Sequence, residues 1–268
     1  MMRQHVRKNF EEKSAYLASI LPAITVTDHP GFLAVDCGLP SDTYNVVAAR
    51  DMSAPAEMLA AVDRFNAKGF PAALWYWEND IADADRAAFL QHSLDYAETH
   101  VAMYANLAEI PTTSYNVAGL EIRLATTARD ILQYGTLVAD LFGASPEGPQ
   151  VFAHFQRLSE HPSSTFPAMR HYLGALHGTV VAVGMLFIGS ETTGIYDVIT
   201  HDDYRRRGIG SAIFQTLLQD ARAWNRRYCV LQASQDGFGI YQRAGFQPIG
   251  NVHTFENRQY LPLPSSHP

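Results

Sequence analysis

Residues 194–224 read GIYDVITHDDYRRRGIGSAIFQTLLQDARAW, and this stretch decides the fold expected for the chain. It begins as an apolar strand, passes through a loop rich in arginine and glycine, and continues as an amphipathic helix. The glycines at 208 and 210 have no Cβ, so the backbone can pass close to a ligand there. We expect the helix over residues 208–224, with its apolar side on a sheet and its first turn exposed.

The start of this helix is the predicted anion site. The first turn of a helix has N–H groups without partners, and the helix dipole adds partial positive charge at the same end. The loop supplies guanidinium groups, which suit phosphates. The spacing matches neither a Walker A loop nor the complete dinucleotide fingerprint. The predicted phosphate-binding residues are Arg205, Arg206, Arg207, Gly208, Ile209, Gly210 and Ser211.

Around this stretch the C-terminal half reads as a mixed α/β layer, with helices on a sheet. A tight turn at His177-Gly178 predicts a hairpin of residues 170–176 and 180–188. Further strands are expected at 120–125, 194–200, 228–233 and 248–255, and further helices at 127–142, after the 144–148 loop and at 238–244. The segment 111–119 reads as an interdomain linker, and residues 261–268 as a disordered tail.

The N-terminal half also alternates strands and helices. Pro55 and Gly69 mark the start and the end of one helix. The expected strands are two between 24 and 36 and others at 44–49, 72–77 and 101–107, and the expected helices cover 2–20, 55–68 and 83–98. No arginine-glycine loop occurs before residue 119, so this half is not expected to bind phosphate.

Composition excludes several function classes. The formal net charge of −7 disfavours attraction to nucleic acid or to an anionic membrane. Cys37 and Cys229 lie far apart without metal-ligand spacing, so we expect two reduced thiols, no metal and a cytoplasmic location. Neither a signal peptide nor an apolar stretch of membrane-spanning length is seen. The sequence leaves a homodimer open.

Two motifs together resemble the GNAT acetyltransferase family. Residues 194–224 resemble its pyrophosphate-binding motif. About thirty residues further on, LQASQDGFGIYQRAGF at 231–246 resembles its second motif. Tyr241 falls on the family's tyrosine position and Gly245-Phe246 on its terminal pair, whereas Ser234 replaces the common asparagine. The resemblance covers residues 120–255 and extends more weakly to the N-terminal half.

The resemblance implies an α/β GNAT fold, a mixed and largely antiparallel sheet flanked by helices. It implies a catalytic domain at 119–268 that binds acetyl-CoA, and a smaller, degenerate GNAT-like domain at 1–118. In the family the strand before the loop holds the pantetheine arm, the loop amides hold the pyrophosphate, and the asparagine makes a polar contact. The further residues implied for CoA binding are Val198, Ile199, Thr200 and Ser234.

The expected reaction is transfer of an acetyl group from acetyl-CoA to a primary amine of a small molecule or peptide. A base must take a proton from the amine, and an acid assists the leaving thiolate. Tyr241 is the expected acid. Asp197, on the strand beside the thioester, is the first candidate base, with Glu191 and His201 as alternatives. The alternative function is a non-catalytic acyl-CoA-binding sensor or scaffold.

Overall fold

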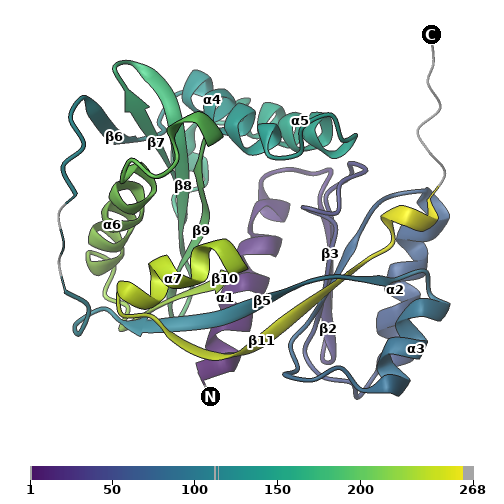
Figure 1. Ribbon diagram of the computed structural model, residues 1–268. Coiled ribbons are helices and arrows are strands. Elements are labelled where there is room, and N and C mark those ends of the chain that lie inside the picture. Colours follow the sequence, from purple (N-terminus) through teal and green to yellow (C-terminus); the bar gives the residue numbers. More distant parts are fainter. Residues whose placement is uncertain (1, 112, 114, 262–268) are drawn as a thin grey trace, which may run out of the picture.

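The computed structural model describes residues 2–111, 113 and 115–261, which form one mixed sheet flanked by helices (Figure 1). Its eleven strands lie in the order β1-β2-β3-β4-β11-β5-β10-β9-β8-β7-β6. The strands are β1 (Thr25–His29), β2 (Phe32–Asp36), β3 (Val46–Ala49), β4 (Ala73–Tyr76), β5 (Asp95–Asn106), β6 (Leu120–Leu124), β7 (Met169–Leu176), β8 (Thr179–Ile188), β9 (Thr193–Thr200), β10 (Tyr228–Ala233) and β11 (Gln247–Glu256). The helices are α1 (Met2–Ala15), α2 (Pro55–Lys68), α3 (Asp83–Gln91), α4 (Ala128–Asp140), α5 (Glu147–Ser159), α6 (Ile209–Arg222) and α7 (Gln235–Arg243).

The order of elements repeats along the chain. The series β1-β2-β3-α2-β4-α3-β5 is followed by β7-β8-β9-α6-β10-α7-β11. In each series the third and fourth strands are parallel neighbours, β3 with β4 and β9 with β10. The last strands are exchanged, because β5 pairs with β10 whereas β11 pairs with β4. The centre of the sheet is therefore shared by both halves, and the domain boundary at residues 118/119 stays a prediction.

Alternation along the strands divides the core between the two faces of the sheet. On β2, Leu33 and Val35 face the cluster that contains α1, α4 and α5, whereas Phe32 and Ala34 face the cluster of α2 and α3. A third cluster forms where α6 and α7 pack on the strands of the second half. Figure 1 shows α1 in the middle of the molecule, with α4 and α5 beside it. The face with α1 thus brings both halves of the chain together.

Local signals predicted one hairpin and one helix correctly. The hairpin of β7 and β8 turns at His177 and Gly178, whose φ angles are 50° and 86°. Helix α2 begins at Pro55 and ends at Gly69, which has φ 66°. The two cysteines, Cys37 and Cys229, are free and buried. Within the described residues, no helix is both long and apolar enough to span a membrane.

The helix expected over 83–98 is wrong in its second half. Helix α3 ends at Gln91, and Ser93 has a φ of 60°, which breaks the helix. Residues from Asp95 onward extend β5, because they pair with β11 from the far end of the chain. That pairing is long-range, so the local pattern did not reveal it. The tail at 262–268 and positions 112 and 114 of the expected linker lie outside the described residues.

Candidate active site

The parallel strands β9 and β10 separate soon after they meet. They pair only at Thr193 with Cys229 and at Gly194 with Val230. Farther along, β9 stays paired with β8 up to Thr200, and β10 stays paired with β5 up to Ala233. The facing edges of the two strands are therefore unpaired with each other over the rest of their length. This leaves backbone groups on the β10 side of β9 for another partner, since strand edges present N–H and C=O groups.

A β-bulge lies on β9 beside this opening. Asp197 and Val198 together face Gly184, between the pairs Tyr196 with Met185 and Ile199 with Val183. The φ of Asp197 is 52°, a left-handed conformation that aspartate adopts more readily than most residues. Bulges redirect side chains and are common next to active sites. Here the bulge is located at the predicted base.

Asp197 lines a cavity of about 90 Å³ between the two halves of the chain. Asp197 as a residue keeps accessible surface although protein surrounds its carboxylate, and it lines this cavity. The buried Tyr134 on α4 donates a hydrogen bond of 3.1 Å from its hydroxyl to Oδ2 of Asp197. Other lining residues come from both halves and include Lys13, Tyr44, His154, His171, Phe155 and Met185.

The charges in this cavity influence one another. Burial raises the pKa of Asp197, while the ammonium of Lys13 and the hydrogen bond from Tyr134 oppose that rise. Burial lowers the pKa of Lys13, and the carboxylate of Asp197 opposes that change. A carboxylate with a raised pKa is a stronger base than an ordinary aspartate, and it stays ionised above that pKa. The cavity therefore holds one acid–base group beside the opening in the sheet.

Two histidines in the wall of the cavity are neutral. Burial lowers the pKa values of His154 and His171 to about 3. The ring of His154 stacks on Tyr44 with centroids 3.9 Å apart, and His171 lies edge-on to Tyr134 at 4.7 Å. Nδ1 of His171 is buried without a hydrogen-bond partner in the described part of the chain. These side chains form an aromatic wall with polar ring atoms.

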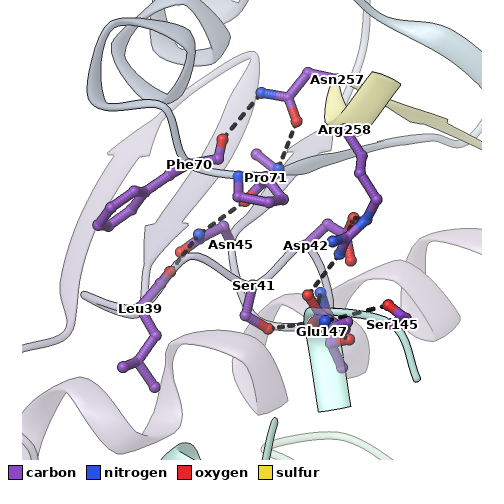
Figure 2. A network of polar contacts seen from close by, with 12 residues as sticks. Leu39, Ser41, Asp42, Asn45, Phe70, Pro71, Ser145, Glu147, Asn257 and Arg258 are labelled. Atoms are coloured by element: carbon purple, nitrogen blue, oxygen red, sulfur yellow. Dashed lines mark hydrogen bonds and ion pairs between the residues drawn. The ribbon is translucent and has the colours of Figure 1, made fainter. Parts of the chain in front are cut away.

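The loop that carries Tyr44 into the cavity is held by a buried polar network (Figure 2). Glu147, at the start of α5, is only 1% exposed. Its Oε1 accepts hydrogen bonds from the hydroxyls of Ser41 at 2.5 Å and Thr43 at 2.6 Å. Its Oε2 pairs with Arg258 of the C-terminal segment at 2.5 Å. The network joins three distant parts of the sequence next to the cavity.

At the other end of the opening, the loop after β9 leads into α6 as predicted. Gly208 precedes the helix with φ 80°, and no side chain caps the helix. The first helical hydrogen bond runs from Ala212 N–H to Gly208 O, so the N–H groups of Ile209, Gly210 and Ser211 have no partner within the helix. A Cβ on Gly210 would lie 3.1 Å from Oγ1 of Thr200. The glycine thus keeps the helix start close to the end of β9.

The three loop arginines are exposed and differ in their contacts. Arg205 pairs with Asp202 at 2.8 Å and donates to the carbonyl of Thr200 at 3.2 Å. The guanidinium of Arg207 lies over the Tyr204 ring at 5.2 Å. Arg206 has a φ of 60°, which bends the backbone before the helix. The loop is compact, with cationic groups around the exposed helix start.

Tyr241 lies in α7, and Ser234 immediately precedes this helix. Burial raises the pKa of Tyr241 to about 12, and its ring packs against Phe214 of α6 with centroids 5.0 Å apart. Ser234 caps the helix, because its Oγ accepts a hydrogen bond of 3.3 Å from the N–H of Gly237. Tyr241 belongs to the core cluster of α6, whereas Asp197 faces the cavity on the α1 side. The two predicted catalytic side chains thus belong to different parts of the core.

The alternative bases lie elsewhere on β9. Glu191 precedes the strand, at the end opposite the loop, where Lys8 and His5 hold it and lower its pKa. His201 follows the strand, and its Nδ1 accepts a hydrogen bond of 3.3 Å from the N–H of Asp203. Neither lines the cavity. Among the three candidates, Asp197 is the one that the cavity contains.

Sequence reasoning missed most of the cavity. Lys13 and Tyr44, which line it, and Tyr134, which donates a hydrogen bond to Asp197, were not singled out. These residues lie on elements that are far apart in the chain, and each fits an ordinary amphipathic pattern. No local signal therefore identified them. Within the described residues, no group of three or more side chains is arranged to bind a metal ion.

Comparison with known proteins supports this reading of the fold. Residues 137–246 match the model of the acetyltransferase (GNAT) family. A GCN5-related N-acetyltransferase from Kribbella flavida has a similar structure, with a TM-score of 0.64 and 14% identity over 92% of this chain and 94% of that one. A GCN5-related N-acetyltransferase from Sphaerobacter thermophilus has a TM-score of 0.56 and 15% identity over 84% of this chain and 80% of that one. A tandem GNAT protein from the clavulanic acid biosynthesis pathway has a TM-score of 0.57 and 9% identity over 94% of each chain.

The sequence has no significant match among curated proteins. At identities this low, structural similarity establishes the fold, and the family model identifies the second half independently. The matched residues run from within α4 to the end of the second motif and include β9, the loop and α6. Residues 137–246 therefore match the GNAT acetyltransferase family model, and the chain as a whole has the GNAT fold.

Proposed function

We propose that this protein is an acetyl-CoA-dependent N-acetyltransferase that acts on a primary amine. The observation that carries the proposal is the position of Asp197. Its bulge lies on the one strand that borders the opening in the sheet, leads into the arginine-glycine loop and lines the cavity. A donor held along β9 and an acceptor held in the cavity would meet at this residue.

The donor side combines several features that suit acetyl-CoA. The N–H groups at the start of α6, together with Arg205, Arg206 and Arg207, suit a pyrophosphate. The backbone at Val198, Ile199 and Thr200 suits the amide groups of a pantetheine arm, because that edge of β9 is not paired with β10. Ser234 remains a proposed polar contact beside its role as a helix cap.

The chemistry assigned to the residues is direct transfer. Asp197 takes a proton from the ammonium form of the amine, and the neutral nitrogen then forms a bond to the thioester carbonyl carbon. Backbone N–H groups of β9 stabilise the oxyanion of the tetrahedral intermediate. As the carbon–sulfur bond breaks, the hydroxyl of Tyr241 donates a proton to the leaving sulfur. The nitrogen of the intermediate then gives its extra proton to the Tyr241 phenolate, and Asp197 releases its proton to water. The products are an acetylated amine, a free thiol and one proton, so atoms and protons balance.

The N-terminal half is proposed to be a related copy that has lost its donor site. Its elements follow the same order as those of the second half. However, the counterpart of α6 is α2, which follows Ala54 and starts at Pro55, a residue with no N–H group. Arg50, which precedes this helix, forms salt bridges with Glu11 and Asp28. The first half instead supplies α1, β2 and the Tyr44 loop to the cavity wall.

A thiol-release assay with acetyl-CoA and a panel of primary amines tests the proposal. We expect thiol release that depends on the amine, and an equal amount of acetylated amine by mass spectrometry. Binding of acetyl-CoA without turnover of any amine would favour the alternative of a non-catalytic acyl-CoA sensor. Absence of both binding and turnover would contradict both functions.

A further inference from the structure

Lys13 in the cavity wall has no carboxylate partner. Its ammonium lies 5.2 Å from the Phe10 ring centroid and 5.0 Å from that of Tyr196. No salt bridge joins Lys13 to a carboxylate within the described residues, although its neighbour on α1, Lys8, pairs with Glu191. An enclosed ammonium without a counter-ion is costly, because aromatic faces replace only part of its hydration. Lys13 therefore has capacity for an anionic group in direct contact with its ammonium, which none of the described residues supplies.

Lys13 and Asp197 have opposite charges but do not form an ion pair in contact. Both line the same cavity, and their charges act on each other's titration. The one hydrogen bond to the Asp197 carboxylate comes from Tyr134, among the described residues. The cavity thus presents a separate cationic and anionic group to whatever enters it. This arrangement complements a molecule that contains one ammonium and one carboxylate.

The remaining wall is apolar or aromatic. Val35, Val138, Leu158 and Met169 line it from four different elements, and the neutral His154 and Tyr44 rings form a flat side. Asp197 is the only carboxylate that lines this cavity within the described residues. A polyamine or aminoglycoside would therefore bury extra positive charges beside Lys13 without partners, which is unfavourable. An apolar side chain of the acceptor would instead be stabilised here, because its surface leaves water and packs against this apolar wall.

We propose that the acceptor is an amino acid with an apolar side chain, whose carboxylate pairs with Lys13 and whose amine is presented to Asp197. This inference rests on the proposed acetyltransferase function, because it names the acceptor of that site. The side chain of the amino acid occupies the apolar part of the cavity. Lys13, from the first half of the chain, then determines specificity for a carboxylate.

Matched pairs of amines with and without the carboxylate provide the test. The probes are phenylalanine against phenethylamine and leucine against 3-methylbutylamine, with spermidine as a polycation. We expect the wild-type protein to prefer each amino acid in kcat/KM by about 10- to 100-fold, the range of a hydrogen bond to a charged group. In Lys13→Met that preference should disappear, because any effect of the lost ammonium on Asp197 is shared by both members of a pair. Lys13→Arg should restore part of it.

Lys8→Met is the matched control, since Lys8 is on the same helix but pairs with Glu191 outside the cavity. It should keep the wild-type preference. Equal losses for both members of a pair in Lys13→Met, or a wild-type preference for the decarboxylated amines or spermidine, would overturn the inference while leaving an acetyltransferase.

Calorimetric titration of phenylalanine and phenethylamine into the protein with CoA present separates the two proposals. Lys13-dependent binding of phenylalanine without turnover would support an amino-acid site at Lys13, but it would contradict the catalytic function and with it the role of phenylalanine as acceptor. If phenylalanine and leucine neither bind nor react, the acceptor inference is wrong, whether or not other amines are acetylated.

Discussion

Tyr134 donates its hydroxyl hydrogen bond to Oδ2 of Asp197 over 3.1 Å, and so connects α4 to the bulge of β9. Tyr134 has 0% exposure, so its ring fixes one side of a carboxylate whose other side faces the cavity. The same strand continues to the loop that begins α6. The proposed donor and acceptor sites are thus linked by eight residues of one strand, Thr193–Thr200.

The start of α6 should determine acetyl-CoA binding. Gly210→Glu places a negative side chain next to the N–H groups proposed for the pyrophosphate, so it should abolish the increase in Tm that acetyl-CoA gives the wild type. Differential scanning fluorimetry with and without acetyl-CoA measures this. Gly210→Ala is the control, because its Cβ would lie 3.1 Å from a rotatable threonine hydroxyl and needs only a small adjustment. An unchanged response in Gly210→Glu would locate the donor elsewhere.

Each chain should bind one acetyl-CoA. The first half lacks a glycine loop before α2, and Pro55 removes one N–H group from the start of that helix. Isothermal titration calorimetry of the wild type should therefore give a stoichiometry of one per chain. A stoichiometry of two would contradict the loss of the donor site in the first half.

Tyr241→Phe should separate catalysis from binding. Burial raises the pKa of Tyr241 to about 12, so its hydroxyl is protonated throughout the neutral range and available as an acid. Removing the hydroxyl should lower kcat by about 10²–10⁴-fold with little change in acetyl-CoA affinity. Tyr104→Phe, which loses a hydroxyl bonded to Gln247 on the surface, should leave kcat unchanged. Full kcat in Tyr241→Phe would make this residue a packing residue only.

The Glu147 network should affect stability and the acceptor, but not the donor. Glu147→Gln removes a buried charge that pairs with Arg258 and accepts hydrogen bonds from Ser41 and Thr43. We expect a loss of about 1–3 kcal/mol in the free energy of unfolding, measured by urea denaturation. The KM for the amine should rise, because Thr43 and Tyr44 line the cavity, while acetyl-CoA affinity is kept.

The exposed Glu160 at the end of the same helix gives the control Glu160→Gln, which should change neither property. A rise in acetyl-CoA dissociation constant equal to the rise in KM would show that Glu147 supports the whole domain rather than the cavity.

What the sequence predicted was determined by local chemistry. The loop from Arg205 to Gly210 and the hairpin at His177-Gly178 contain their own glycines, charges and turns, so their conformations could be anticipated. The first half of strand β5 could not, because residues 95–100 become a strand only through pairing with β11. Nor could the cavity, since Lys13 and Tyr134 meet near Asp197 through packing of both halves on one face of the sheet. Asp197 was selected for its place on the strand, and its bulge and hydrogen bond emerged only from the structure.

The bulge at Asp197 makes an informative variant available. Asparagine has the same shape, tolerates the left-handed conformation at φ 52° and can still accept the Tyr134 hydrogen bond, but it cannot take a proton. Burial raises the pKa of Asp197 above its usual value of 3.8, so the base becomes protonated and inactive as the pH falls through that raised pKa. In the wild type, the slope of log kcat/KM against pH should become steeper by about one unit at pH values below the pKa of Asp197.

The most direct test of the account is therefore the steady-state rate of thiol release by wild type and Asp197→Asn, measured across pH with the same amine and saturating acetyl-CoA. The account predicts that kcat falls by about 10²–10⁴-fold in Asp197→Asn, that the steepening at low pH disappears, and that the acetyl-CoA dissociation constant is kept. An Asp197→Asn variant with the wild-type rate and pH profile would contradict it.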